Sequence, residues 1–133
     1  MDYSTLNLKK FSNVGSKISR KISITGSYSF GIPPAFYEEH GIKDYSYAVV
    51  FYDEQNQVIG VQFTKEKEKD SSFKLIPYGS EVKMGASFVA RSFFNTHDID
   101  IAQIKGRYDP EEHTFPDIGK VFLIDLKERK KEE

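Results

Sequence analysis

One short frame of residue types occurs twice in this chain, and it restricts the architecture more than any other pattern. Residues 35–42 read AFYEEHGI and residues 92–99 read SFFNTHDI, so each runs Phe, aromatic, two polar residues, His, one further residue and Ile. The frame uses two of the three histidines in the chain. About ten residues after each frame, a Tyr-Asp pair (Tyr52–Asp53 and Tyr108–Asp109) precedes a predicted turn and strand. Internal repetition of this kind outranks local patterns when a fold is inferred.

The repetition predicts two tandem strand–helix–strand–strand repeats, residues 17–64 and 72–126. A unit of about forty residues cannot bury a core of its own, so the repeats are expected to pack together as one domain with pseudo-two-fold symmetry. The 133 residues include 11 Phe and 8 Tyr, which favour strands. The predicted fold class is therefore mainly β (α+β), arranged as a β-barrel or sandwich. We expect a flexible arm over residues 1–16 and a frayed, charged tail over residues 127–133.

Strands are predicted from hydrophobic periodicity. Between residues 16 and 25, Ile18, Ile22 and Ile24 alternate with polar residues, as expected for a strand with one solvated face. In the segment 58–63, Ile59, Val61 and Phe63 should share one face in the same way. The remaining expected elements are strands over residues 47–52, 73–79, 81–86 and 121–126, a turn at 53–57, a charged loop at 65–70 and a turn-rich connection at 106–119.

Two short helices are predicted at the repeated frames. Pro33 and Pro34 suit the first turn of a helix, and Gly41 is a natural place for that helix to end. The second helix is predicted over residues 87–97, with Ser87 as its N-cap. Each helix would carry one apolar stripe at i, i+4 and i+8: Ile32, Phe36 and His40 in the first, Val89, Phe93 and His97 in the second.

The two equivalent histidines have two interpretations. They could form a metal pair or a pH switch, because imidazole is a common ligand and titrates near neutrality. Alternatively, each ring covers the Phe one turn earlier near a helix C-terminus, where a positive charge is favourable. We favour the structural role, because the neighbouring acids Glu38, Glu39 and Asp98 are generic surface residues without ligand spacing. His113 is expected to be solvated in a loop.

The sequence gives no sign of catalysis. Nucleophile-elbow, P-loop, dinucleotide-binding and zinc-protease motifs are all missing from the sequence, and the chain has no cysteine. The pairs Glu38–Glu39 and Glu111–Glu112 are adjacent in sequence, which directs the two carboxylates apart. We therefore expect a protein that is not an enzyme and that has no cofactor and no metal. With no long apolar segment and no signal-peptide pattern, the expected location is the cytoplasm, away from membranes.

Basic residues are concentrated at the start of the chain. The formal net charge is −1, so a polyanion would need a local cluster of cations. Five cations occur in the first twenty-one residues beside a single acid, Asp2; they are Lys9, Lys10, Lys17, Arg20 and Lys21. Such a stripe could contact phosphates, with an affinity that falls as salt rises. It could equally solubilise an arm and an edge strand, where lysine discourages aggregation.

The segment from Ser19 to Phe63 resembles the AbrB/MazE/MraZ class of swapped-hairpin DNA-binding domains. The resemblance is carried by five features: Arg20–Lys21, Gly26, Ile32–Pro33, Gly41–Ile42 and the hairpin around residues 53–57. It implies a β-rich fold of two interlocked copies that binds DNA through basic residues of the first strand and the following turn. Two copies in one chain, as in the MraZ branch, would fit the internal repeat. This chain departs from the family pattern at Ser27, at Glu38–Glu39 and at Val89–Ala90.

The first functional hypothesis is a small nucleic-acid-binding protein, an AbrB-like regulator of transcription that acts as a homodimer. Lys17, Arg20 and Lys21 would hold phosphates, with Lys83 and Arg91 as pseudo-symmetric helpers. Double-stranded DNA is the expectation from the resemblance. Single-stranded binding is a variant, since aromatic side chains can serve as stacking platforms on a sheet.

The second hypothesis is a protein-interaction module, either antitoxin-like or an assembly subunit, without nucleic-acid binding. Tyr and Phe are enriched at protein interfaces. An exposed patch formed by four tyrosines would favour this hypothesis; they are Tyr28, Tyr45, Tyr47 and Tyr78.

Overall fold

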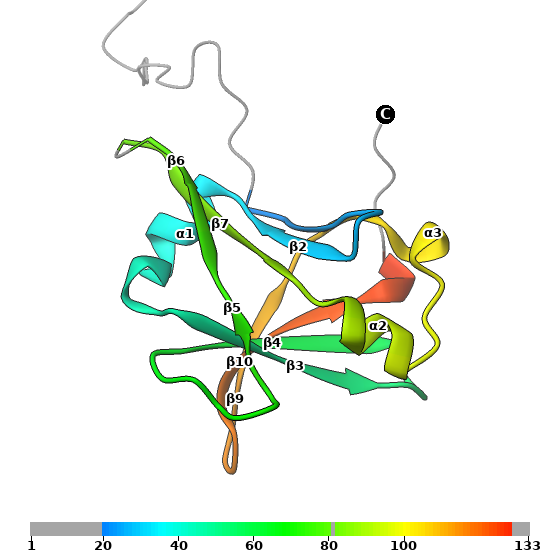
Figure 1. Cartoon of the computed structure of the whole chain (residues 1–133). Coiled ribbons are helices and arrows are strands. Elements are labelled where there is room, and N and C mark those ends of the chain that lie inside the picture. Colours follow the sequence, from blue (N-terminus) through cyan, green and yellow to red (C-terminus); the bar gives the residue numbers. More distant parts are fainter. Residues whose placement is uncertain (1–19, 81, 129–133) are drawn as a thin grey trace, which may run out of the picture.

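The computed structural model describes residues 20–80 and 82–128, which form two five-stranded antiparallel sheets whose strands are connected in part by short helices (Figure 1). The first sheet has the order β6 (Ile76–Gly79), β7 (Met84–Val89), β2 (Ser29–Ile32), β1 (Ile22–Ile24) and β8 (Gly106–Tyr108). The second has the order β5 (Phe73–Lys74), β3 (Tyr47–Asp53), β4 (Val58–Thr64), β10 (Gly119–Asp125) and β9 (Glu111–Phe115). The prediction of a mainly β chain is confirmed.

The helical elements are all short. They are α1 (Pro34–Glu39), η2 (Ile42–Asp44), α2 (Arg91–Thr96), α3 (Ile101–Ile104) and η3 (Leu126–Glu128). Helix α1 begins at the predicted prolines, and the chain leaves it through Gly41, whose φ of 61° lies in the left-handed region that glycine tolerates. Figure 1 shows α1 and α2 on different sides of the molecule, each following a strand of the first sheet.

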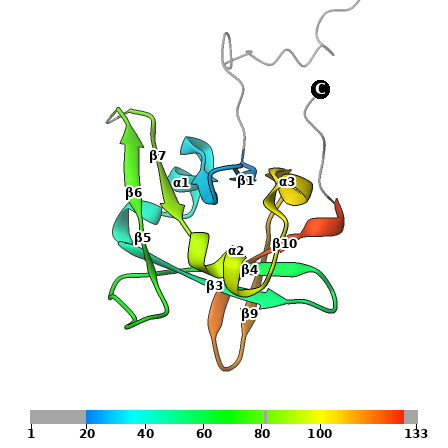
Figure 2. The same cartoon turned by 45° about the vertical axis from the view of Figure 1, so that its right-hand side comes forward.

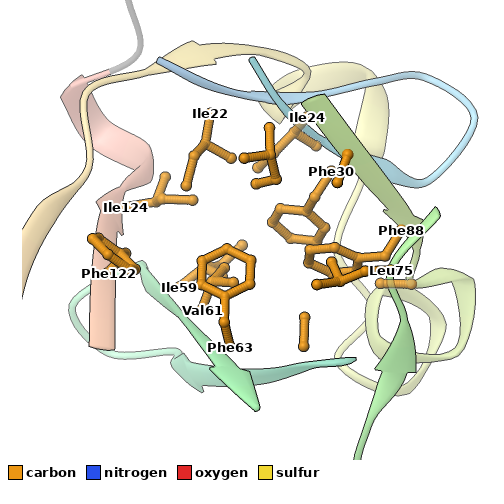
Figure 3. Close-up of a cluster of buried hydrophobic side chains, with 14 of the residues drawn as sticks. Ile22, Ile24, Phe30, Ile59, Val61, Phe63, Leu75, Phe88, Phe122 and Ile124 are labelled. Carbon is orange, nitrogen blue, oxygen red and sulfur yellow. The ribbon is translucent and has the colours of Figure 1, made fainter. Parts of the chain in front are cut away.

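The inner faces of the two sheets form one core (Figure 3). Ile22, Ile24 and Phe30 face inward from the first sheet, opposite side chains such as Ile59 and Ile124 of the second. Alternate residues of a strand point to opposite faces, which is why the period-2 patterns of β1 and β4 correctly identified their buried positions.

Aromatic rings fill the centre of this core. Phe30 stacks on Phe88 with ring centroids 4.8 Å apart and on Phe94 at 5.5 Å. Offset or tilted aromatic pairs of this kind add about 0.5–1.5 kcal/mol beyond the burial of their area. The three rings come from β2, β7 and α2, so they join the first half of the chain to the second.

The two halves of the chain meet at the centre of each sheet. Strand β2 pairs with β7, and β4 pairs with β10, both antiparallel. In the first sheet β6 and β1 flank the central pair, and β8 is the edge strand beyond β1. In the second sheet β3 and β9 flank the central pair, and β5 is the edge strand beyond β3.

The predicted helix over residues 87–97 is wrong in its first turn. Ser87 is not an N-cap: it lies in β7, opposite Gly31 on one side and Ile76 on the other. The helix begins only at Arg91, after Ala90. Val89 is 50% exposed and does not belong to the predicted stripe. The helix prediction fails here because burial follows period 2 rather than 3.6. Alternate residues of the segment are fully buried, as in a central strand; they are Ala86, Phe88 and Ala90.

Two further segments differ from prediction. The strand expected over residues 73–79 bends at the buried Leu75, so β5 belongs to one sheet and β6 to the other. The connection expected over residues 106–119 contains two strands, β8 and β9, and His113 lies exposed on β9 rather than in a loop. Tyr108 pairs with Ile22 in the first sheet, whereas Tyr52 lies in the second, so these two tyrosines are not equivalent.

Candidate nucleic-acid interface

The cations predicted on the first strand lie at the entrance to β1. Arg20 is exposed, and its Nε donates to the Glu39 Oε2 of α1 at 2.9 Å. Lys21 is partly buried beside it. Lys17 and Ile18 lie outside the described residues. Within the described residues β1 begins at Ile22, so Arg20 and Lys21 precede the strand, and Arg20 already has a carboxylate partner.

The two predicted helper residues are at opposite ends of the first sheet. Strands β2 and β7 run antiparallel, so Lys83 lies beyond the Ile32 end of β2 and Arg91 beyond the Ser29 end. Lys83 is exposed at the turn between β6 and β7, where its backbone N–H donates to the Ser80 carbonyl at 3.1 Å. The Arg91 guanidinium lies over the Tyr28 ring, 4.8 Å from its centroid. The described candidate residues thus do not form one cluster.

The histidines of the repeated frame cover aromatic rings. His40 lies 4.4 Å from the Phe36 ring and 4.8 Å from Phe122, and His97 lies 5.0 Å from Phe93 and 5.1 Å from Tyr52, between centroids. Each histidine therefore ties its helix to a strand of the second sheet. Within residues 20–80 and 82–128, no three His, Asp or Glu side chains are placed to hold a metal ion.

A hollow that sequence reasoning missed lies where the chain crosses from β5 to β6. Its volume is about 310 Å³. The side chains that carry its chemistry are Lys43, Tyr45, Tyr47 and Lys74, and its floor includes the buried Tyr37, Leu75 and Ala86. Figure 2 shows the start of β3 beside the β5–β6 segment, and both segments contribute residues that line the hollow. We call this site the lysine–tyrosine hollow, after Lys43, Tyr45, Tyr47 and Lys74.

Backbone hydrogen bonds fix the walls of the lysine–tyrosine hollow. The Leu75 N–H donates to the Ser46 carbonyl at 2.9 Å, and the Ser46 N–H donates to the Thr64 carbonyl at 3.0 Å. Tyr47 and Lys74 are direct cross-strand partners, so their side chains emerge on the same face. The Tyr37 hydroxyl, at the floor of the hollow, is 3.4 Å from the Met84 Sδ.

The lysines of the hollow carry exposed charge. In the part of the chain that the structure describes, neither Lys43 nor Lys74 forms an ion pair. Asp44, next to Lys43, is an exposed acid at the same border. The sequence held a weak signal, because each lysine adjoins an aromatic residue, in KDYSY and in FK. Only the pairing of β3 with β5 brings the two segments together.

The hairpin of β6 and β7 exposes apolar side chains. Ile76 is 53% exposed, Tyr78 45%, Val82 87% and Val89 50%. The Tyr78 hydroxyl donates to the Ile32 carbonyl at 3.2 Å, and partial burial raises the pKa of that hydroxyl. The four tyrosines proposed as a patch are dispersed: Tyr28 lies beneath Arg91, while Tyr45 and Tyr47 line the hollow.

Comparisons of the chain with protein-family models, with curated proteins and with solved structures found no significant match. In the described ranges, no helix is long and apolar enough to cross a membrane. The class that the geometry defines is a mainly β domain of two antiparallel sheets with a basic, aromatic hollow on one flank.

Proposed function

We propose that this chain is a small nucleic-acid-binding protein, acting in the regulation of transcription without catalysis or cofactor. The observation that carries the proposal is that four separate segments near α1 carry cations, which are spread over this flank rather than joined in one cluster. They are Arg20 and Lys21 before β1, Lys43 in η2, Lys74 in β5 and Lys83 after β6. Cations spread over one flank in this way can attract phosphates although the whole chain is close to neutral.

Register supports the placement of these cations on one flank. Ser23 pairs with Gly31, so the residues before β1 run beside the start of α1, and Arg20 contacts Glu39 at the end of that helix. The turn that holds Lys83 follows the same end of the sheet, since Met84 next to it contacts Tyr37 of α1. Arg91 stands apart, beside the turn between β1 and β2.

We also propose that the two halves of the chain are copies of one unit, arranged with pseudo-two-fold symmetry as in the AbrB-like family. Support comes from the central antiparallel pairs, β2 with β7 and β4 with β10. Helices α1 and α2 each follow one of the central strands of the first sheet, and each ends in a histidine that covers a phenylalanine. In that arrangement the first strand and its turn would face duplex DNA.

The test is fluorescence anisotropy of labelled random-sequence DNA, double- and single-stranded, titrated with the full chain from low to physiological salt. We expect an affinity that falls as salt rises, with a slope that reports the number of phosphates neutralised. Replacing Lys17, Arg20 and Lys21 with Ala should weaken binding further. The matched control replaces three exposed lysines of the loop after β4: Lys65, Lys67 and Lys69. Absence of binding at the lowest salt would contradict the proposal.

A second candidate function is a protein-interaction module, favoured by the exposed apolar side chains of the β6–β7 hairpin. Val82, 87% exposed at the turn, is the clearest of these. If the hairpin joins two copies as a homodimer, sedimentation should show self-association that Val82→Ser reduces. A chain that remains monomeric at all concentrations would contradict a homodimer formed through this hairpin.

A further inference from the structure

The lysine–tyrosine hollow combines two features that a nucleotide requires, positive charge and aromatic rings. Lys43 and Lys74 are exposed on its rim, and Tyr45 and Tyr47 are partly buried in its wall. Stacking of a base on an aromatic side chain is insensitive to sequence, because every base has a π-face. A lysine ammonium provides three donors for phosphate oxygens without demanding one fixed geometry.

The hollow is built on paired backbone, which limits how far its walls can move. Tyr47 is anchored in β3 by pairing with Thr64 on one side and with Lys74 on the other. The Tyr37 hydroxyl is already placed against Met84, and Leu75 is only 6% exposed at the floor. A ligand would therefore enter a surface that exists before binding, so little ordering cost opposes it.

Size and shape favour an unpaired base over a base pair. The volume of about 310 Å³ is at the lower end of the range of roughly 300–1,000 Å³ typical of small-molecule sites. It is bordered on one side by η2 and the start of β3, and on the other by β5 and β6. A duplex keeps its bases stacked inside, so it could offer the hollow only phosphates. A single strand can turn one base out.

From these observations we propose that the lysine–tyrosine hollow binds one unpaired nucleotide of a single-stranded nucleic acid. The base stacks against Tyr47, with Tyr45 beside it, and the flanking phosphates lie between Lys43 and Lys74. This inference rests on the proposed nucleic-acid binding and adds a preference: single strands should bind more tightly than duplexes of the same length.

The experiment compares a fluorescein-labelled short oligothymidine with a duplex of equal length, by anisotropy with the full chain at several salt concentrations. The first variant is Tyr47→Ala, which removes the stacking ring. We expect oligothymidine binding to weaken about tenfold, the size of one lost base–aromatic stack. Tyr47→Phe keeps the ring and should bind as the parent chain does. The thermal transition of Tyr47→Ala, measured by circular dichroism, separates loss of stacking from loss of structure.

A further variant replaces Lys43 and Lys74 together with Ala. We expect the salt slope for the single strand to fall by about 0.7 for each phosphate that the variant no longer neutralises. The matched control removes two exposed lysines of the loop after β4, Lys65 and Lys67, and should leave the slope unchanged. All four substituted lysines are exposed, so both double variants should fold.

Three results would overturn the inference while leaving nucleic-acid binding intact: equal affinity for duplex and single strand, unchanged binding by Tyr47→Ala, or displacement of the strand by polyglutamate at equal charge. The last would show that the hollow recognises negative charge alone. If neither DNA binds at low salt, the proposed function itself fails, and the inference fails with it.

Discussion

Gly85 shows how one residue without a side chain shapes the first sheet. A Cβ at this position would lie 2.6 Å from the Ile32 carbonyl oxygen and 2.7 Å from the Cζ and hydroxyl of Tyr78. The Tyr78 ring crosses β7 at this glycine to reach the Ile32 carbonyl on β2. The φ angle of Gly85 is not positive, so its backbone conformation does not require glycine. Glycine is needed because Tyr78 and the Ile32 carbonyl approach its Cα closely.

We predict that Gly85→Ala destabilises the chain by about 1–3 kcal/mol, the usual cost of overpacking. Tyr78 can swing away, but the Ile32 carbonyl belongs to the backbone of a central strand and cannot. Urea denaturation followed by circular dichroism measures the change. Gly26→Ala is the control, because a Cβ there meets only the Lys105 Cδ at 3.9 Å. Equal stability of the two variants would contradict the role of close approach at Gly85.

The role of His40 in packing can be distinguished experimentally from a role as a metal ligand. Its ring lies between Phe36 and Phe122, and its Nδ1 is 3.9 Å from Glu112 Oε1. We predict that His40→Ala costs about 1 kcal/mol, because the variant has no ring to pack on the two phenylalanines. His40→Phe should restore most of that stability, and zinc should not change the melting temperature of the parent chain. A rise in melting temperature with zinc would instead indicate a metal ligand.

At the level of elements, the β3–β4 turn depends on one carboxylate. Asp53 Oδ1 accepts the Asn56 backbone N–H at 3.1 Å, and Asp53 Oδ2 accepts the Asn56 side-chain N–H at 2.7 Å. These hydrogen bonds, the side-chain one first, lower the pKa of Asp53 below its ordinary value of 3.8. A lowered pKa in the folded state contributes stability above the unfolded pKa, and this contribution is lost as pH falls through the folded pKa.

We predict that Asp53→Ala lowers the melting temperature at neutral pH and has progressively less effect below the ordinary pKa of 3.8, where the parent loses the same contribution. Thermal melts across that acid range measure the difference. Glu54→Ala, at the neighbouring exposed position, is the control for removing a charge. A difference between parent and Asp53→Ala that stays constant down to the most acidic pH would contradict the role of the ionised carboxylate.

The elements that could be predicted are those whose pattern is local. Helix α1 and the β3–β4 hairpin have proline, glycine and turn residues at their ends, so the sequence predicts both. Segment 84–97 could not be divided from spacing alone. Val89, Phe93 and His97 satisfy a helical period, while the burial that makes 84–89 a strand comes from pairing with β2 and β6. The structure of this segment is therefore determined by pairing with distant strands and not by its local periodicity.

At the level of the whole molecule, the candidate site was beyond sequence reasoning for a similar reason. The density of basic residues indicates the first strand as a phosphate site, but Arg20 before that strand forms an ion pair with Glu39 of α1. Lys43 and Lys74 belong to segments with no shared motif, and they meet only because β5 pairs with β3. A site assembled by long-range strand pairing leaves no spacing signal in the sequence.

The same long-range pairing makes a strong prediction about folding. The central strands of both sheets come from different halves, β2 beside β7 and β4 beside β10, and Phe30 stacks on Phe88 and Phe94 across this junction. Neither half can bury these faces alone, so residues 1–70 and 71–133, expressed separately, should lack a cooperative thermal transition. Mixing the two pieces should restore strand content and a single transition, measured by circular dichroism. A cooperative transition in either isolated piece would mean that one half contains a sufficient core, and the two halves would then have to be regarded as separable units.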